Sequence, residues 1–125
     1  MTVLLVLLGG AVGAPSRYLI DRYVQRRHES VFPWGTLTVN LIGCLILGLL
    51  AGAAHGLPKP VVTLAGTGFC GALTTFSTFG FETTRLLEDG SFREAGLNVV
   101  AGLGLGLLAA TAGYLIGVSV STTWP

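Results

Sequence analysis

One short segment holds most of the side chains that could do chemistry. Residues 68–79 read Gly-Phe-Cys-Gly-Ala-Leu-Thr-Thr-Phe-Ser-Thr-Phe, a glycine-rich half followed by a half crowded with hydroxyl groups. Phe76 and Phe79 are three residues apart, so they lie on one face of a helix. Aromatic rings are positive at their edges, and hydroxyl groups donate hydrogen bonds. Two phenylalanines alone indicate core packing, but the interleaved Ser77 and Thr78 favour a site for a small anion.

Two further polar side chains lie in apolar surroundings. Asn40 has two amide donors and one acceptor oxygen, so it suits either a hydrogen bond between helices or donation to an anion. Glu82 continues a helical stripe from Thr75 and Thr78 towards the membrane surface. Its place near the end of its segment gives little support to proton-coupled antiport, which needs an ionisable group near the midplane.

The elements that carry these residues are four apolar segments. The chain has 125 residues, 51% hydrophobic and 10% charged, whereas a soluble domain carries roughly 25% charged residues. Segments 3–20, 34–54, 61–87 and 95–120 each approach the length of about 20 residues that spans a bilayer. We therefore predict an all-α integral membrane protein with four transmembrane helices in a single domain, 1–125. The first segment lacks a clear cleavage site and is interpreted as a retained span.

The third segment is predicted to be a broken helix. Gly66, Gly68 and Gly71 loosen its first half, and hydroxyl side chains crowd its second half. In lipid, a broken helix survives only where it lines a cavity or is buried in protein. Its ends offer partial charges and carbonyl oxygens to ions. This segment is therefore the expected ion or substrate site.

Basic residues are distributed unevenly between the two membrane faces. With four spans, both termini lie on one side and the first and third loops on the other. The loop side has six arginines, and the terminus side has only Lys59. The arginines are Arg17, Arg22, Arg26, Arg27, Arg85 and Arg93. The positive-inside rule predicts a multi-pass plasma-membrane protein with both termini outside the cell.

Glycines recur four residues apart, a spacing that lets helix backbones approach closely in lipid. The pairs are Gly9 and Gly13, Gly48 and Gly52, Gly102 and Gly106, and Gly113 and Gly117. We expect them to build a tight bundle rather than a chemical site. Cys44 and Cys70 both fall within spans, where a thiol is usually a small apolar group, and no disulfide is expected.

Taken together, these residues resemble the Fluc (CrcB) family of fluoride channels over essentially the whole chain. The resemblance is carried by residues 9–18 with Arg17, by residues 35–40, and by residues 68–79 with Glu82. It implies a passive, fluoride-selective channel that exports cytoplasmic fluoride and so reduces its toxicity. It also implies an antiparallel, dual-topology dimer with two pores.

The resemblance further implies roles for individual residues. The fluoride path would be formed by Asn40, Phe76, Phe79, Ser77, Thr78 and Glu82. A structural sodium ion, which is not transported, would lie at the dimer centre. Backbone carbonyls of Gly71 and Thr74 from both chains would bind it.

The chain departs from the family in its fourth span and in its charge. Gly106 and Ala110 occupy positions where relatives carry small hydroxyl residues, which leaves Thr111, Asn98 and Tyr114 as polar candidates. A dual-topology homodimer requires one sequence to insert both ways, which six basic residues against one disfavour. We therefore expect pairing with an oppositely biased paralogue, and a homodimer is the alternative.

Two other functional classes fit the composition. A small four-span drug exporter has a similar length, but it would need an acidic residue in the middle of its first span, and residues 3–20 contain none. A non-transporting membrane assembly subunit would explain the glycines and the charge, but not the third segment. An enzyme is the least favoured class, because no nucleophile–base pair or paired carboxylates are present, and no basic face for nucleic acid is seen.

Overall fold

The computed structural model describes residues 1–123 and contains, within them, helices but no strand. Helix α1 is followed by α2, and the third span is assembled from several consecutive pieces before α6. The bounds are α1 Thr2–Arg26, α2 Trp34–Gly52, η1 Ala54–Gly56, α3 Lys59–Val62, η2 Thr63–Cys70, α4 Gly71–Leu73, α5 Phe76–Glu88 and α6 Phe92–Thr123. Here η1 is a 3₁₀ turn and η2 is a π-helix.

Four helical segments of the described chain are long and apolar enough to cross a membrane. They are Thr2–Arg26, Trp34–Gly52, Lys59–Glu88 and Phe92–Thr122. The predicted all-helical, multi-pass membrane protein is thereby confirmed. Helix α1 continues beyond the predicted end at residue 20, because the charged residues that follow it can stay helical at the level of the lipid headgroups.

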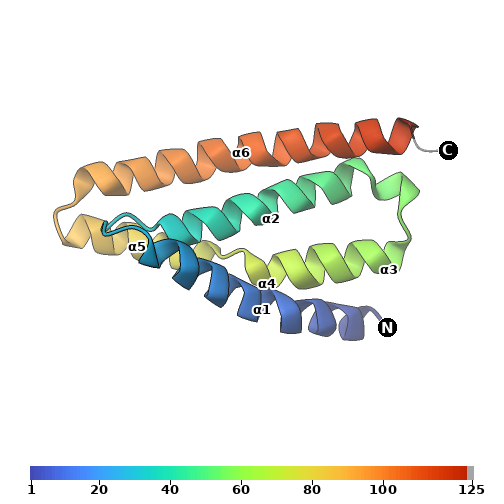
Figure 1. Cartoon of the computed structure of the whole chain (residues 1–125), viewed down its shortest axis with the longest axis horizontal. Helices are drawn as coiled ribbons and strands as arrows, with labels where there is room; N and C mark the ends of the chain where they lie inside the picture. The colour runs from blue at the N-terminus through green and yellow to red at the C-terminus, as the bar shows by residue number, and fades with distance from the viewer. Residues whose placement is uncertain (124–125) are drawn as a thin grey trace.

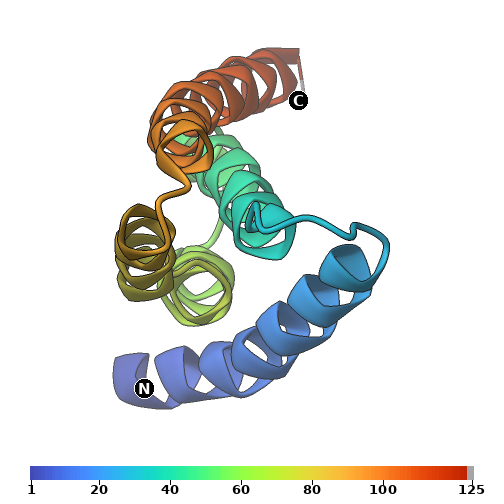
Figure 2. The same ribbon diagram turned by 90° about the vertical axis from the view of Figure 1, so that its left-hand side faces the viewer.

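The spans run along the long axis of the molecule. Figure 1 shows the α1–α2 and α5–α6 connections at one end, and the N-terminus and the α2–α3 connection at the other. Figure 2, which looks along that axis, places α1 and α6 on opposite sides, with α2 and α5 between them. Gly90, whose φ of 79° favours glycine, lies in the tight turn between α5 and α6.

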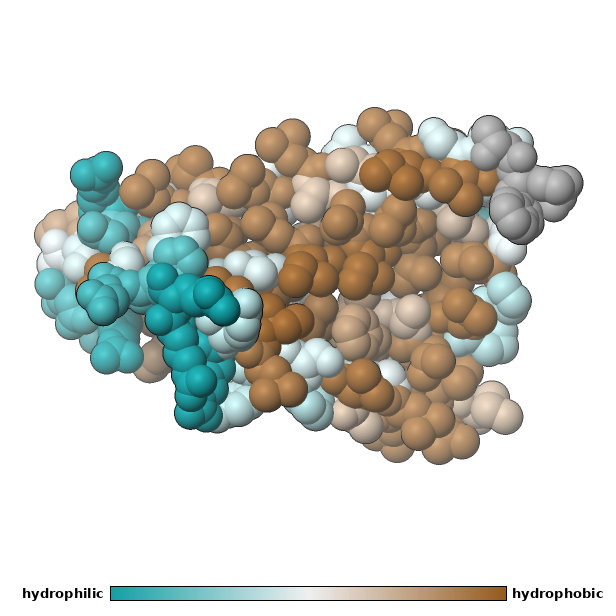
Figure 3. Space-filling model, in the orientation of Figure 1, coloured by the Kyte–Doolittle hydropathy of each residue, from teal (hydrophilic) through white to brown (hydrophobic). Residues whose placement is uncertain are grey.

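Charged residues gather at the end of the molecule where α1 meets α2 and α5 meets α6. Hydrophilic residues concentrate there in Figure 3, whereas most of the remaining surface on that face is hydrophobic. All six acidic residues and six of the seven basic ones belong to the second half of α1, the first loop, α5, the turn that follows α5, or the start of α6. This distribution is that of a membrane protein with one strongly polar end.

Glycines allow the helices to approach each other closely. A Cβ atom added at Gly48 would overlap the carbonyl of Ala110, and one at Gly113 would overlap the carbonyl of Leu45, so α2 and α6 meet backbone to backbone. Gly9 and Gly13 let α1 approach η2 in the same way. In lipid, such close packing is a main source of helix association.

The predicted pair Gly102 and Gly106 behaves differently from the other three pairs. An added Cβ at Gly102 would meet the ring of Phe79, and one at Gly106 would meet the Sγ atom of Cys44 at 3.7 Å. These two glycines therefore make room for side chains rather than for another helix backbone.

The seam between α2 and α6 generates a first prediction. Gly113→Leu should lower the free energy of unfolding by about 1–3 kcal/mol, since the new side chain would overlap the backbone of α2. Thermal unfolding in detergent measures this loss. Gly104→Leu is the matched control, because an added Cβ there meets nothing within 4 Å. Equal unfolding temperatures for the two variants would contradict the packing described above.

Candidate functional site

Two residues with extended backbone separate α4 from α5 within the third span. Thr74 has φ −81° and ψ 155°, and Thr75 has φ −148° and ψ 123°. In a continuous helix, the N–H of residue 75 would donate to the carbonyl of Gly71, and that of Thr78 to the carbonyl of Thr74. Extended residues cannot keep this pattern, and in hydrocarbon every such backbone group needs a partner.

Asn40 of α2 provides the partner for Thr75. Its Nδ2 donates to the Thr75 carbonyl at 3.0 Å, and the Thr75 N–H donates to its Oδ1 at 2.8 Å. The side chain thus binds both backbone polar groups of one extended residue, as a neighbouring strand would. Its second Nδ2 hydrogen is the only one of this amide left to reach an anion.

The hydroxyl of Thr75 begins helix α5. Its Oγ1 accepts from the backbone N–H of Thr78 at 3.1 Å, which is the bond of an N-cap residue. The same hydroxyl donates to Oγ1 of Thr78 at 3.1 Å and lies 3.3 Å from Oγ of Ser77. Three predicted polar side chains therefore form one hydroxyl cluster at the start of α5.

These side-chain bonds leave two backbone carbonyl groups without their usual helical hydrogen-bond donors. Asn40 takes the N–H that would have bonded Gly71, and Thr75 takes the N–H that would have bonded Thr74. The carbonyls of Gly71 and Thr74 thus lose the donors of a continuous helix. They are the two carbonyls that the family resemblance implies as sodium ligands, and a hard cation prefers oxygen ligands of this kind. Within residues 1–123, no cluster of three or more histidine, cysteine or acidic side chains offers a different metal site.

The two phenylalanines lie beside this interruption. Their ring centroids are 5.8 Å apart, with 40° between the ring planes. The Phe76 side chain is 80% exposed, whereas Phe79 is partly buried against α6. Both rings line a groove of about 240 Å³. Its lining is formed by Asn40, Cys44, Leu47, Thr74, Thr75, Phe76, Phe79, Gly102 and Leu103.

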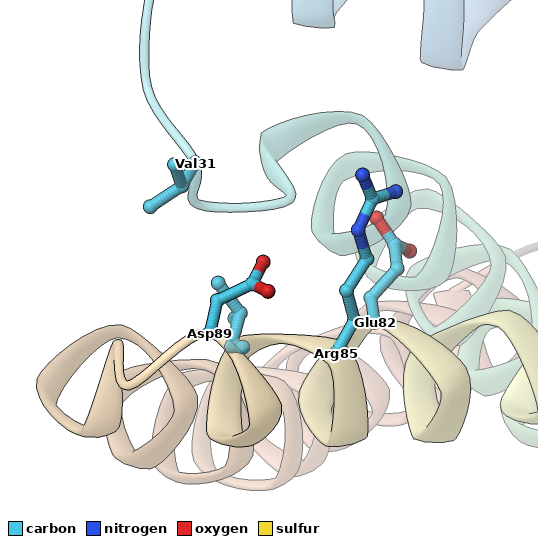
Figure 4. A pocket seen from close by; sticks show the side chains of 5 residues that line it. Val31, Glu82, Arg85 and Asp89 are labelled. Carbon is cyan, nitrogen blue, oxygen red and sulfur yellow. The ribbon is translucent and has the colours of Figure 1, made fainter.

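Glu82 occupies a separate cavity at the charged end. The hydroxyl of Thr36 donates to its carboxylate. The cavity, of about 260 Å³, is lined by Val31, Glu82, Arg85, Leu86 and Asp89. Figure 4 shows Glu82 and Arg85 of α5 and Asp89 just after its end, with Val31 of the first loop across from them. Arg17 lies on α1 and lines neither this cavity nor the groove.

Two residues of the fourth span that the sequence singled out make contacts with other helices. Asn98 is buried and its Nδ2 donates to Oγ1 of Thr83 at 2.8 Å, so it joins α6 to α5. Ala110 places its carbonyl against Gly48 of α2. Sequence reasoning missed Thr36 and Thr83 as partners of Glu82 and Asn98, and the only available signal was that hydroxyl residues lie within apolar segments.

The chain is similar to known proteins over most of its length. A family model described as "CrcB-like protein, Camphor Resistance (CrcB)" matches residues 4–114. A Streptomyces avermitilis protein named fluoride-specific ion channel FluC 1 is 56% identical, covering 90% of this chain and 93% of the relative. A Frankia casuarinae protein of the same name is 50% identical, covering 97% and 96%. In Mycobacterium tuberculosis H37Rv, fluoride-specific ion channel FluC 2 is 52% identical, covering 89% and 86%.

The bonds between Asn40 and Thr75 generate a second prediction. Asn40→Ala leaves the N–H and the carbonyl of Thr75 without partners in an apolar setting, at a cost of about 1–3 kcal/mol per group. The unfolding temperature in detergent should fall. Thr38→Ala is the control, since it removes only a hydroxyl bond to the Trp34 carbonyl within α2. If Asn40→Ala unfolds at the same temperature as the control, Asn40 does not hold the interruption in place.

Proposed function

The chain belongs to the CrcB family, and on that premise we propose that it forms a passive, fluoride-selective channel that exports cytoplasmic fluoride. The observation that carries the proposal is the site in the third span. There, two phenylalanine rings, a hydroxyl cluster and an amide meet at an interrupted helix. Relatives that are about half identical to this chain bear the name fluoride-specific ion channel.

The proposed ion path replaces the water shell of fluoride with weak donors. Fluoride is small and strongly hydrated, so a lumen that conducts it must offer many compensating contacts. The positive edges of Phe76 and Phe79 and the hydroxyls of Ser77 and Thr78 supply them. The second amide hydrogen of Asn40 adds a stronger donor. Selectivity against chloride follows from a narrow lumen built around these groups.

Glu82 stands at the charged end of this path. In the proposal it belongs to the polar side of the route by which fluoride approaches from the Arg-rich face. Arg85 and Asp89 line the same cavity, so this end of the proposed path carries both positive and negative side chains.

A structural sodium ion at the dimer centre is the second part of the proposal. The carbonyls of Gly71 and Thr74 would hold it, together with the same groups of a second chain. Support comes from the two hydrogen bonds that divert the helical donors away from these carbonyls. When bound, the ion would supply positive charge that balances carbonyl dipoles brought together from two chains.

Dimer formation explains the exposure of the site. Phe76 is 80% exposed in the single chain, and Gly71 is also exposed. A second chain running in the opposite direction would cover both and close the groove into a lumen. Six arginines on one face against one lysine on the other favour a paralogue of opposite bias as that partner. A dual-topology homodimer is the alternative.

No energy source is needed for export in the proposed mechanism. Moving one charge through 100 mV is worth about 2.3 kcal/mol. At about 1.4 kcal/mol per decade, this membrane potential holds internal fluoride roughly 50-fold below external fluoride. A passive channel in the plasma membrane, with both termini outside, would therefore protect the cell.

The ring-edge role generates a third prediction. Phe76→Ile should strongly reduce fluoride efflux from potassium-loaded liposomes after valinomycin, because an aliphatic side chain has no positive edge. An ion-selective electrode measures the efflux, and gel filtration checks that the dimer remains intact. The control is Phe81→Ile, which replaces an exposed aromatic residue on the same helix. Unchanged fluoride efflux in Phe76→Ile would remove the ring edges from the mechanism.

The charge bias generates a fourth prediction, about orientation. A tag at the C-terminus should be accessible only from outside the cell, because six arginines hold the opposite face in the cytoplasm. Protease accessibility in intact cells and in inverted vesicles measures this. Equal accessibility on the two faces would contradict the paralogue proposal and establish dual topology.

A further inference from the structure

Gly102 of helix α6 lies against the ring of Phe79. A Cβ atom added at Gly102 would lie 2.9 Å from Cε1 of Phe79 and 3.5 Å from its Cζ. The ring therefore occupies space that any side chain at position 102 would need. The neighbouring glycines Gly96 and Gly104 meet nothing within 4 Å, so this contact is particular to Gly102.

The backbone of Phe79 is tied to the same helix. Asn98 is 1% exposed, and its Nδ2 donates to Oγ1 of Thr83 at 2.8 Å. The Thr83 hydroxyl donates in turn to the carbonyl of Phe79 at 2.8 Å. Asn98 and Gly102 are four residues apart, so they lie on one face of α6. One face of α6 thus contacts Phe79 twice, through the Asn98–Thr83 bonds that reach the Phe79 carbonyl and through Gly102 at the Phe79 ring.

We propose that Asn98 and Gly102 are positioning residues that fix the orientation of the Phe79 ring in the fluoride path, a role that rests on the proposed channel function. The edge of an aromatic ring is positive and its face is negative. A ring that turns away from its seat would present its face to the anion and repel it. The ring of Phe79 contributes to conduction only while α6 holds its orientation.

The variant Gly102→Ala separates this role from ordinary helix stability. Alanine forms helices better than glycine, so the substitution itself favours α6. Any loss must then come from the displaced ring. Gly104→Ala is the matched control, because it makes the same exchange on the same helix where an added Cβ meets nothing.

Fluoride efflux from liposomes is the first readout. At equal amounts of folded dimer, Gly102→Ala should reduce the efflux rate on the order of tenfold, and Gly104→Ala should leave it unchanged. Thr83→Val, which removes the hydroxyl between Asn98 and Phe79, should also reduce it. If Gly102→Ala conducts as well as Gly104→Ala, the proposal that Gly102 positions the Phe79 ring is overturned. Wild-type efflux from Thr83→Val overturns the part played by Asn98.

A second readout does not depend on conduction. Gly102→Ala should lower the unfolding temperature when residue 79 is phenylalanine, but not in the Phe79→Ala background, where the overlapping ring is gone. Neighbouring sites that share a contact show this kind of non-additivity. Strictly additive effects of Gly102→Ala and Phe79→Ala on the unfolding temperature would overturn the proposal that Gly102 positions the ring. If the wild-type protein conducts no fluoride, the proposed function fails, whereas this thermal cycle still decides whether Gly102 seats the ring.

Discussion

The structure depends on how a helix can be interrupted inside a membrane. Hydrocarbon provides no water to bond a free N–H or carbonyl, so an extended residue there must find both partners within the protein. Thr75 finds them in the single side chain of Asn40 and offers its own hydroxyl to the N–H of Thr78. The same bonds that stabilise the interruption release the carbonyls of Gly71 and Thr74. An arrangement that satisfies one part of the backbone thus leaves another part without its helical donors, and the proposed sodium site uses those carbonyls.

The rest of the fold positions this interruption. Glycines bring α2 against α6 and α1 against η2, so each of these pairs of helices packs backbone to backbone. Gly43 provides room for the methyl group of Thr74 beside α2. The packing leaves the Phe76 side of α5 open, and in the proposed function a second chain completes the site. That openness, together with the uneven charge, is why a second chain of opposite orientation is central to the proposed function.

Much of this organisation could be predicted from the residues, and some of it could not. Four spans follow from apolar length, and the glycine pairs predicted a tightly packed bundle, in which three of the four pairs meet another helix backbone. The partner of each polar group could not be predicted, because Asn40 and Thr75 are far apart in the sequence and any helix rotation would separate them. For Asn40, the residue alone left a choice between a bond to another helix and donation to an anion. Its observed bonds to Thr75 use one of its two Nδ2 hydrogens and leave the other for an anion. In the sequence, Gly102 looks like the other glycines of α6, and only the structure shows that it lies against the ring of Phe79.

Selective fluoride conduction is the central claim, and one flux measurement tests it most directly. The chain should be purified with whatever relative accompanies it from the membrane, reconstituted into liposomes containing fluoride and chloride, and followed with electrodes selective for each ion after valinomycin is added. The account predicts rapid efflux of fluoride and none of chloride. Efflux of both ions, or of neither from any dimer that contains this chain, would contradict it.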